Sequence, residues 1–215
     1  MEVLLGLAEL GVGDADLLEA QLAPPFGDGA REGREVGLAR VGGRVSRYAH
    51  AVEPTPNAGR WYLADAAATE RVGAALAHAL SGGLVVTLRG DLGTGKTTLV
   101  RGLLREAGWA GPVKSPTYTL VEYYELSSLY LYHFDFYRFA DPGEWETAGL
   151  AEYFRRDTAC IVEWPERVQS LLPLPDLSIV LAHAGDGRDL HATSHSAAGD
   201  RCLDAVNRLA RPDQR

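Results

Sequence analysis

The most informative part of the sequence is the stretch Gly90-Asp91-Leu92-Gly93-Thr94-Gly95-Lys96-Thr97. It matches the phosphate-loop pattern G-x-x-x-x-G-K-[ST] at every fixed position, and about 0.002 to 0.003 such matches would be expected by chance in a chain of this composition. Glycines accept backbone angles that turn successive N–H groups inward, and the helix that follows adds its positive end. The stretch therefore predicts a site that binds phosphate groups.

The residues of this phosphate loop have expected roles. Lys96 bridges the β- and γ-phosphates of a nucleotide, Thr97 ligates Mg²⁺ through its hydroxyl, and Thr98 reaches the α-phosphate. The expected binding residues are Gly90, Asp91, Leu92, Gly93, Thr94, Gly95, Lys96, Thr97 and Thr98. The chain has no Asn-Lys-x-Asp segment of the kind that reads guanine, which favours ATP over GTP. We therefore expect ATP and Mg²⁺ as cofactors.

Apolar periodicity places the phosphate loop between a strand and a helix. Residues 84–88 are typical of a buried strand, and residues 96–107 of a helix with one apolar face. The other expected elements are a helix capped by Asp65, a hairpin of strands at 119–124 and 129–134, a helical patch at 145–154, a strand at 159–162, a helix opened by Pro165, paired strands at 177–182 and 188–192, and a closing helix at 198–209. This order predicts an α/β fold: a P-loop NTPase-like three-layer domain with a mainly parallel central sheet, a β-hairpin and antiparallel edge strands.

Residues 1–60 differ from the rest of the chain. They contain Pro24-Pro25, Gly42-Gly43 and Pro54-Thr55-Pro56 with only scattered apolar periodicity, although residues 4–22 could form a helix. Two interpretations remain open, a poorly ordered extension or over-long start and a small docking element. We therefore divide the chain into a poorly defined N-terminal extension, residues 1–60, and a P-loop ATPase domain, residues 61–215.

Composition excludes several classes of protein. Hydrophobic residues at 46% and charged residues at 23% are typical of a globular chain, and no apolar run approaches the ~20 residues of a membrane span. The net charge of -8 repels nucleic-acid backbones, so contact with RNA is expected only locally or through a partner. Cys160 and Cys202 cannot build a disulfide framework or a four-thiolate zinc site, which favours the cytoplasm. Lys96 and Lys114 are the only lysines, which indicates positions where a compact ammonium is needed.

Two carboxylates are candidates for holding Mg²⁺ and orienting the attacking water. Asp135 ends the apolar run 129–134, where it can face the phosphate loop; the alternative is a solvated acid paired with Arg138. Glu163 ends the run 159–162, and its alternative is an acid at a helix entry beside Pro165. The expected catalytic residues are Lys96, Asp135 and Glu163, and the expected metal-binding residues are Thr97, Asp135 and Glu163.

Residues 115–119 are rich in hydroxyl groups and restrained by one proline. The segment reads Ser115-Pro116-Thr117-Tyr118-Thr119. Ser115, Pro116, Thr117 and Thr119 form a candidate switch that closes over the γ-phosphate, as switch segments of GTPases do. A simple turn before the hairpin is equally consistent with the pattern.

Other polar and aromatic residues favour structural roles. His133 is typical of a packed histidine or one that supports a neighbouring ligand, rather than of a base. His191 and His195 have a spacing that suits a metal only on a helix, so we expect no metal site there. An aromatic strip is more typical of sheet packing than of an RNA-stacking face. The strip consists of Tyr123, Tyr124, Tyr130, Tyr132, Phe134 and Tyr137.

These motifs, in this order, resemble a single protein family. The matching segments are residues 90–102, Ser115 to Val121, Tyr132-His133-Phe134-Asp135-Phe136-Tyr137-Arg138, Gly149-Leu150 with Glu152-Tyr153, and Ile161 to Arg167. They resemble the bacterial TsaE (YjeE) family of ATPases, which acts in tRNA threonylcarbamoyladenosine biosynthesis. The resemblance covers roughly residue 61 to the C-terminus. Tyr118 stands where phenylalanine is usual in the family, and residues 1–60 have no counterpart in its compact form.

The resemblance implies what the chemistry of the residues alone does not reach. It implies an ATP-binding domain in which Asp135 and Glu163 assist Mg²⁺ binding and hydrolysis. It also implies a weak, Mg-dependent ATPase, stimulated by its partners, that couples ATP hydrolysis to cycling of the TsaD–TsaB complex. That complex transfers threonylcarbamoyl to an adenosine beside the tRNA anticodon, so tRNA is expected only as an indirect partner and a membrane not at all.

Two other functions remain open at this stage. A P-loop small-molecule kinase would use the same phosphate loop but needs an acceptor pocket and an arginine-rich lid, of which only Arg155-Arg156 is a hint. A nucleotide-gated binding module would use ATP only to order the candidate switch for docking, without hydrolysis.

Overall fold

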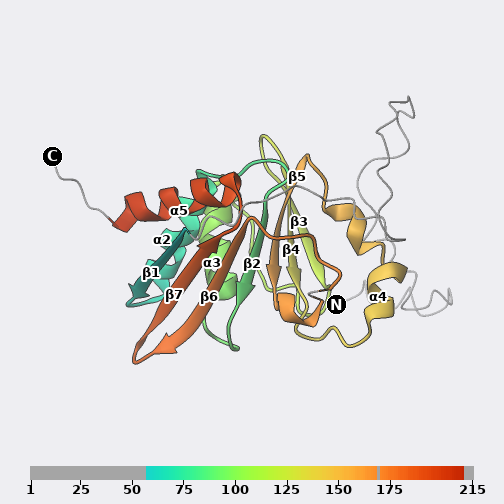
Figure 1. The fold of residues 1–215 in the computed structure, drawn as a ribbon, viewed down its shortest axis with the longest axis horizontal. Coiled ribbons are helices and arrows are strands. Elements are labelled where there is room, and N and C mark those ends of the chain that lie inside the picture. The colour runs from blue at the N-terminus through green and yellow to red at the C-terminus, as the bar shows by residue number, and fades with distance from the viewer. Residues whose placement is uncertain (1–56, 169, 211–215) are drawn as a thin grey trace, which may run out of the picture. The chain divides into compact units, whose positions relative to one another are not determined.

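Seven strands form one mixed sheet in the described part of the chain. The computed structural model describes residues 57–168 and 170–210, and the strand order is β1-β7-β6-β2-β5-β4-β3 (Figure 1). The strands are β1 (Ala58–Leu63), β2 (Val85–Arg89), β3 (Val121–Glu125), β4 (Tyr130–Asp135), β5 (Thr158–Glu163), β6 (Leu177–Ala184) and β7 (Gly187–Ser194). The adjacent strands β6, β2, β5 and β4 are parallel, whereas β3, β7 and β1 join as antiparallel edges. This arrangement confirms the predicted α/β class and its P-loop NTPase-like sheet.

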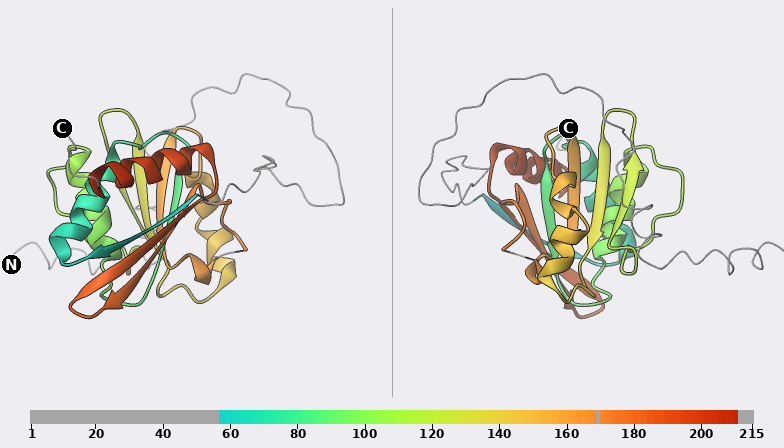
Figure 2. Two further views of the ribbon diagram at one scale, coloured as in Figure 1. Left: turned by 60° about the vertical axis from the view of Figure 1, so that its left-hand side comes forward. Right: turned by 90° about the vertical axis from the view of Figure 1, so that its right-hand side faces the viewer.

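Helices pack on both faces of the sheet. They are α2 (Ala66–Ala77), α3 (Lys96–Glu106), α4 (Pro142–Thr147) and α5 (Ala197–Ala210), with short 3₁₀ turns η1 (Leu150–Tyr153) and η2 (Pro165–Arg167). Helices α2, α3 and α5 share one core with the strands, whereas α4 and η1 belong to a second core built on β4 and β5. The left view of Figure 2 shows α5 crossing in front of the strands.

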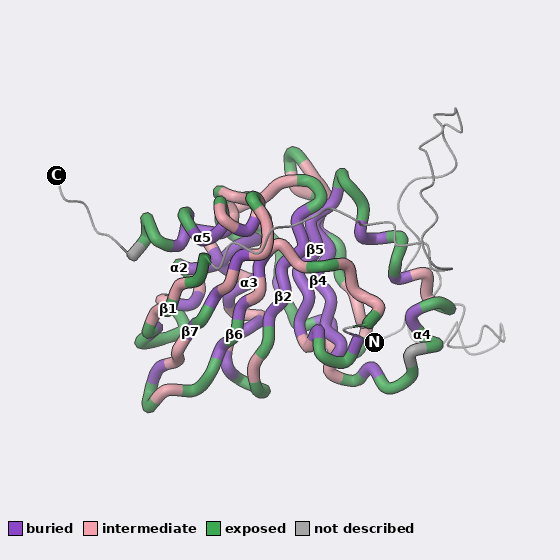
Figure 3. The backbone as a smooth tube through the Cα atoms, in the orientation of Figure 1, coloured by how far each residue is buried: buried purple, intermediate pink, exposed green. Residues whose placement is uncertain are grey.

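The two-residue alternation of the strands sorts side chains between these two cores. Ile161 of β5 packs in the core that contains α3, whereas Val162 packs in the core that contains α4. Both strands β4 and β5 are buried along nearly their whole length (Figure 3). His133, Asp135 and Glu163 have the same parity as Ile161 in the parallel register, so their side chains lie on the face covered by α3.

Helices α2 and α3 approach so closely that each needs a glycine at the contact. A Cβ atom on Gly73 would lie 2.0 Å from the carbonyl oxygen of Leu99, and one on Gly102 would lie 2.0 Å from that of Glu70. A Cβ at either position would therefore force the helices apart. This close contact fixes α3, and with it the phosphate loop, against α2.

The structure differs from the predicted elements at three places. Strand β1 was not predicted, and it begins at Ala58, so the expected boundary after residue 60 falls inside a strand that pairs with β7. The expected helix after Pro165 is only the single turn η2, because Pro173 and Pro175 follow closely and cannot extend a helix. The helical patch at 145–154 is split into α4 and η1 by Gly149, whose φ is 60°.

Part of the chain lies outside these observations. Residues 1–56, which include most of the predicted N-terminal extension and the candidate helix at 4–22, are outside the described residues. Among the described residues, none of the helices has the length and apolar character of a membrane-spanning segment.

Candidate functional site

The phosphate loop connects the C-terminal end of β2 to the first turn of α3. Gly90 has φ 135°, and a Cβ atom there would lie 2.1 Å from the carbonyl oxygen of Leu181 in β6, so no other residue fits. Gly95 is the N-cap residue of α3 and has φ 104°, in the left-handed region. Strand β2 lies between β5 and β6 in the sheet, and such a position at the carboxyl ends of parallel strands is where α/β folds bind ligands.

Lys96 is buried and turned toward the carbonyl oxygens of its own loop. Its Nζ donates hydrogen bonds of 2.6 Å to Gly90 and 2.9 Å to Asp91. Burial lowers the pKa of this ammonium, and the nearby carboxylates of Glu163 and Asp135 oppose the shift. The charge of the Lys96 ammonium is therefore only partly compensated, because the two oxygens that accept its hydrogen bonds are neutral carbonyls.

Trp164 covers this ammonium. Its ring centroid lies 4.2 Å from the Lys96 Nζ atom. The centroid of the Tyr137 ring lies 5.0 Å from the centroid of the Trp164 ring. Trp164 adopts a left-handed backbone conformation with φ 57°, which is uncommon for a large side chain. The turn directly after β5 therefore places an aromatic ring over the phosphate loop. The sequence did not reveal this contact, although the position of Trp164 next to Glu163 was a signal for it.

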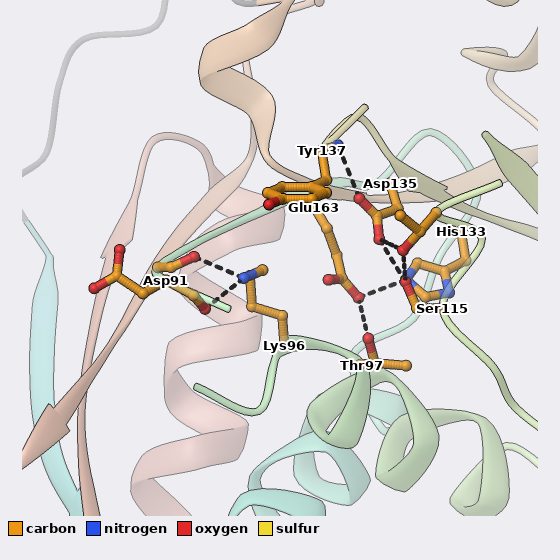
Figure 4. Close-up of polar contacts among 10 residues, drawn as sticks. Asp91, Lys96, Thr97, Ser115, His133, Asp135, Tyr137 and Glu163 are labelled. Carbon is orange, nitrogen blue, oxygen red and sulfur yellow. Dashed lines mark hydrogen bonds and ion pairs between the residues drawn. The ribbon is translucent and has the colours of Figure 1, made fainter. Parts of the chain in front are cut away.

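Glu163 connects the phosphate loop to strand β4. Its Oε1 atom accepts a hydrogen bond of 2.8 Å from the Thr97 hydroxyl and lies 2.9 Å from the His133 Nε2 atom. Figure 4 shows the other carboxylate oxygen on the side of Lys96. Glu163 is 3% exposed and comes from the last position of β5, not from a helix entry. The sheet thus brings an expected metal-binding hydroxyl and an expected catalytic carboxylate into direct contact.

His133 contacts Glu163 from the neighbouring strand β4. The imidazole is completely buried, and its Nδ1 atom has no hydrogen-bond partner among the described residues. The Nε2 atom of His133 donates to the carboxylate of Glu163, which can only accept, and so His133 supports that carboxylate as expected.

Asp135 holds the candidate switch segment. It is buried and accepts hydrogen bonds from the Ser115 hydroxyl, from the Thr117 hydroxyl at 2.6 Å, and from the Tyr137 amide at 2.9 Å. The alternative of a solvated acid paired with Arg138 is wrong. Arg138 instead contacts Tyr118, with its NH2 group donating to the phenol at 3.2 Å and its guanidinium 4.5 Å from the ring centroid.

The remaining predicted residues lie around this centre in different environments. The Thr94 hydroxyl donates to the Asp91 carbonyl at 2.9 Å, and Leu92 is exposed at the tip of the loop. Gly93 and Thr98 belong to the loop and the first turn of α3, and Pro116 is buried. The Thr119 hydroxyl points to Glu122 at 3.3 Å, not to Asp135.

The aromatic strip does not form one surface. Tyr124 packs in the core with α3, whereas Tyr132 and Phe134 pack in the core with α4, and Tyr123 is exposed. Strand alternation divides them, so the interpretation as sheet packing holds for the buried members. His191 is exposed on β7, and His195 contacts the Ser178 hydroxyl at 3.0 Å.

No preformed cage of metal-binding side chains exists in the described residues. None of their His, Cys, Asp and Glu side chains gather in groups of three or more that could hold an ion. A cation at this site would therefore be held by Thr97 and Glu163 together with ligand oxygens, which is how Mg²⁺ is commonly bound beside phosphates.

Comparison with known proteins places this site in a family. Residues 63–190 match the family model described as "Threonylcarbamoyl adenosine biosynthesis protein TsaE". The chain belongs to the TsaE family. This membership confirms the predicted resemblance, and the match contains the phosphate loop, the candidate switch, Asp135 and Glu163.

This chain matches most of the length of its relatives in the TsaE family. The tRNA threonylcarbamoyladenosine biosynthesis protein TsaE of Haemophilus influenzae is 44% identical over 124 residues, which are 58% of this chain and 78% of the relative. The protein of the same name from Bacillus subtilis is 37% identical over 154 residues, 72% of this chain and 95% of the relative. The crystal structure of Bacillus subtilis YdiB aligns with a TM-score of 0.62 and 30% identity, over 73% of this chain and 99% of that chain.

Proposed function

We propose that this chain binds ATP with Mg²⁺ at the phosphate loop, hydrolyses it slowly, and acts in threonylcarbamoyladenosine modification of tRNA. The observation that carries the proposal is the contact of Thr97 with Glu163, which joins the loop hydroxyl to a buried carboxylate at the ends of parallel strands. Membership of the TsaE family, whose curated members are named for this modification, supports the pathway.

Lys96 binds the triphosphate in this proposal. Its ammonium now uses two neutral carbonyl oxygens, those of Gly90 and Asp91. Phosphate oxygens carry negative charge and are stronger acceptors, because charge-assisted hydrogen bonds are roughly twice as strong as neutral ones. Entry of a triphosphate therefore draws the Lys96 Nζ atom away from its loop carbonyls and toward the phosphate oxygens.

Thr97 and Glu163 fit the chemistry of Mg²⁺. Mg²⁺ beside a nucleotide would be held by one or two oxygen-bearing side chains together with phosphate oxygens, and Thr97 and Glu163 supply oxygens of this kind. The Thr97 Oγ1 and Glu163 Oε1 atoms are 2.8 Å apart. When bound, the ion would neutralise charge on the triphosphate, which the carboxylates of Glu163 and Asp135 otherwise repel.

Glu163 also assists hydrolysis in this proposal. Thr97 and His133 both contact its Oε1 atom, so the carboxylate is held in one orientation while the other oxygen faces the Lys96 side of the site. A fixed, buried carboxylate is suited to orient an attacking water molecule.

Asp135 links the catalytic centre to the candidate switch. Ser115 and Thr117 are both hydrogen-bonded to it, so residues 115–119 move only if those bonds change. We assign Asp135 to Mg²⁺ binding and hydrolysis through this segment, with Ser115, Pro116, Thr117 and Thr119 responding to the γ-phosphate.

The partners follow from the family. We propose that ATP hydrolysis serves the TsaD–TsaB complex, and that tRNA is met only through it, since the net charge of -8 disfavours direct binding of a polyanion. The kinase alternative is weakened by the position of Arg155-Arg156. These arginines precede β5, whereas the phosphate loop and Glu163 lie at the opposite ends of the strands, and Arg155 is paired with Asp157.

The proposal is tested by nucleoside analysis of tRNA from cells depleted of this protein. We expect threonylcarbamoyladenosine to fall, and to be restored by the wild-type chain but not by Lys96→Ala or Glu163→Gln. Normal levels of the nucleoside after depletion would contradict the pathway. Restoration by Glu163→Gln, if the variant binds ATP without releasing phosphate, would favour the nucleotide-gated binding module instead.

A further inference from the structure

Arg188 reaches the phosphate loop from the opposite side to Glu163. It is the second residue of β7 and pairs with Leu63 of β1 and His183 of β6. A Cβ atom on Gly95 would lie 3.7 Å from both the Cδ and the Nε atom of Arg188. The side chain of Arg188 therefore packs against the residue that opens α3 and directly precedes Lys96.

A buried threonine holds the guanidinium in this position. The NH1 group of Arg188 donates to the Thr69 hydroxyl at 3.1 Å, and that hydroxyl donates to the Asp65 carbonyl at 3.2 Å. Thr69 is completely buried in α2, and its methyl group would lie 3.5 Å from the same Cβ position on Gly95. Arg188 is thus anchored at one nitrogen, while its Nε atom lies beside Gly95 of the loop.

The charge of Arg188 has no counter-ion in the described part of the chain. No Asp or Glu side chain there lies within 4.0 Å of its guanidinium, and its Nε atom is buried with no hydrogen-bond partner. Leaving a partly buried cation without an anion costs free energy. Arginine has five donors in a planar fork that suits phosphate oxygens.

The two sides of the loop therefore differ in charge. The carboxylates of Glu163 and Asp135 come from β5 and β4 on one side of β2, whereas Arg188 comes from β7 on the other side. The end of the triphosphate that meets Mg²⁺ belongs beside the carboxylates. With the triphosphate in that orientation, the guanidinium of Arg188 is on the side of the phosphates nearer the nucleoside.

We propose that Arg188 is a further nucleotide-binding residue, whose guanidinium donates to a phosphate oxygen on the nucleoside side of the triphosphate. This inference rests on the proposed binding of ATP at the phosphate loop. Arg188 acts as a second cation beside Lys96, and Thr69 positions it.

The test is titration calorimetry of the full chain with Mg·ATP and with inorganic tripolyphosphate. Arg188→Met should weaken binding of both by about 10- to 100-fold, the effect of losing a hydrogen bond to a charged group. Thr69→Val, which removes the anchor but keeps the guanidinium, should weaken both by a smaller factor. Arg60→Met is the matched control, since Arg60 lies on β1 and is already paired with Asp189, and it should bind both as the wild type does.

Each outcome decides the inference. Equal loss for ATP and tripolyphosphate supports a phosphate contact. Loss for ATP alone would mean that Arg188 meets the base or ribose, and no loss for either would mean that it only packs against the loop; both overturn the proposal. If Arg188→Met fails to fold, Arg188→Gln, which keeps part of the packing, takes its place. Failure of the wild-type chain to bind either compound would contradict the proposed function itself.

Discussion

The Thr97 hydroxyl donates a 2.8 Å hydrogen bond to the Oε1 atom of Glu163. The two residues come from different elements, the first turn of α3 and the last position of β5, and they meet because β2 and β5 are parallel neighbours that end at the same edge of the sheet. The site thus holds a hydroxyl and a carboxylate, two kinds of oxygen that suit Mg²⁺, side by side at one edge of the sheet.

Replacing Thr97 should remove the gain in ATP affinity that Mg²⁺ provides. Thr97→Val keeps the shape of the side chain but has no oxygen to offer, so we expect its affinity for ATP in Mg²⁺ to fall about tenfold. The measurement is calorimetric titration with ATP in Mg²⁺ and in EDTA, and Thr97→Ser is the control that should retain the metal effect. An equal gain from Mg²⁺ in Thr97→Val and the wild type would rule out Thr97 as a ligand.

The two lysines of the chain form a matched pair for testing the phosphate loop. Lys96 is buried against loop carbonyls, whereas Lys114 is exposed in the segment before the candidate switch. Lys96→Ala should weaken ATP binding at least about 30-fold, because it removes the charge partner of a buried phosphate. Lys114→Ala should bind ATP like the wild type in the same assay. ATP binding by Lys96→Ala at wild-type strength would show that the triphosphate lies elsewhere.

Trp164 should report nucleotide binding through its fluorescence. Its ring covers the Lys96 ammonium at 4.2 Å, and movement of that ammonium toward phosphate changes the charge at the ring face. We expect ATP to change the intrinsic emission of the wild type and of Trp61→Phe, which alters a distant tryptophan on β1. Trp164→Phe should lose the change while still binding ATP by calorimetry. A signal that survives in Trp164→Phe would place the responding tryptophan outside the site.

The glycine contact between α2 and α3 should be sensitive to one added methyl group. Gly102→Ala places a Cβ atom 2.0 Å from the Glu70 carbonyl oxygen, so we expect the free energy of unfolding to fall by about 1–3 kcal/mol. Urea unfolding followed by circular dichroism measures this. Gly143→Ala is the control, since its Cβ atom would lie no closer than 3.3 Å to a neighbour, and it should change stability by less than about 1 kcal/mol. Equal stability of Gly102→Ala and the wild type would contradict the close helix contact.

Local sequence patterns predicted the elements that surround the phosphate loop. The strand at 84–88 and the helix at 96–107 correspond to β2 and α3 within a residue, because apolar spacing and a fixed glycine pattern report local structure directly. The acids Asp135 and Glu163 were recognised at strand ends for the same reason. Strand β1 was missed, because its short segment Ala58–Leu63 gains its order from pairing with β7, far away in the sequence.

The contacts within the site needed the three-dimensional arrangement of the strands. His133 meets Glu163 only because β4 lies next to β5 in parallel register, and no local spacing encodes that register. The approach of Arg188 to Gly95 likewise depends on β7 pairing with β6, which lies next to β2. Trp164 reaches Lys96 because the chain after β5 turns back in a left-handed conformation, which the adjoining Pro165 does not predict.

The most direct test of the central claim is a crystal structure of the chain with Mg²⁺ and a non-hydrolysable ATP analogue. We predict that the phosphates lie in the loop between residues 90 and 97, that the Lys96 Nζ atom leaves the carbonyl oxygens of Gly90 and Asp91 for phosphate oxygens, and that the ion lies beside Thr97. A triphosphate bound elsewhere, with Lys96 still bonded to its own loop, would contradict the account.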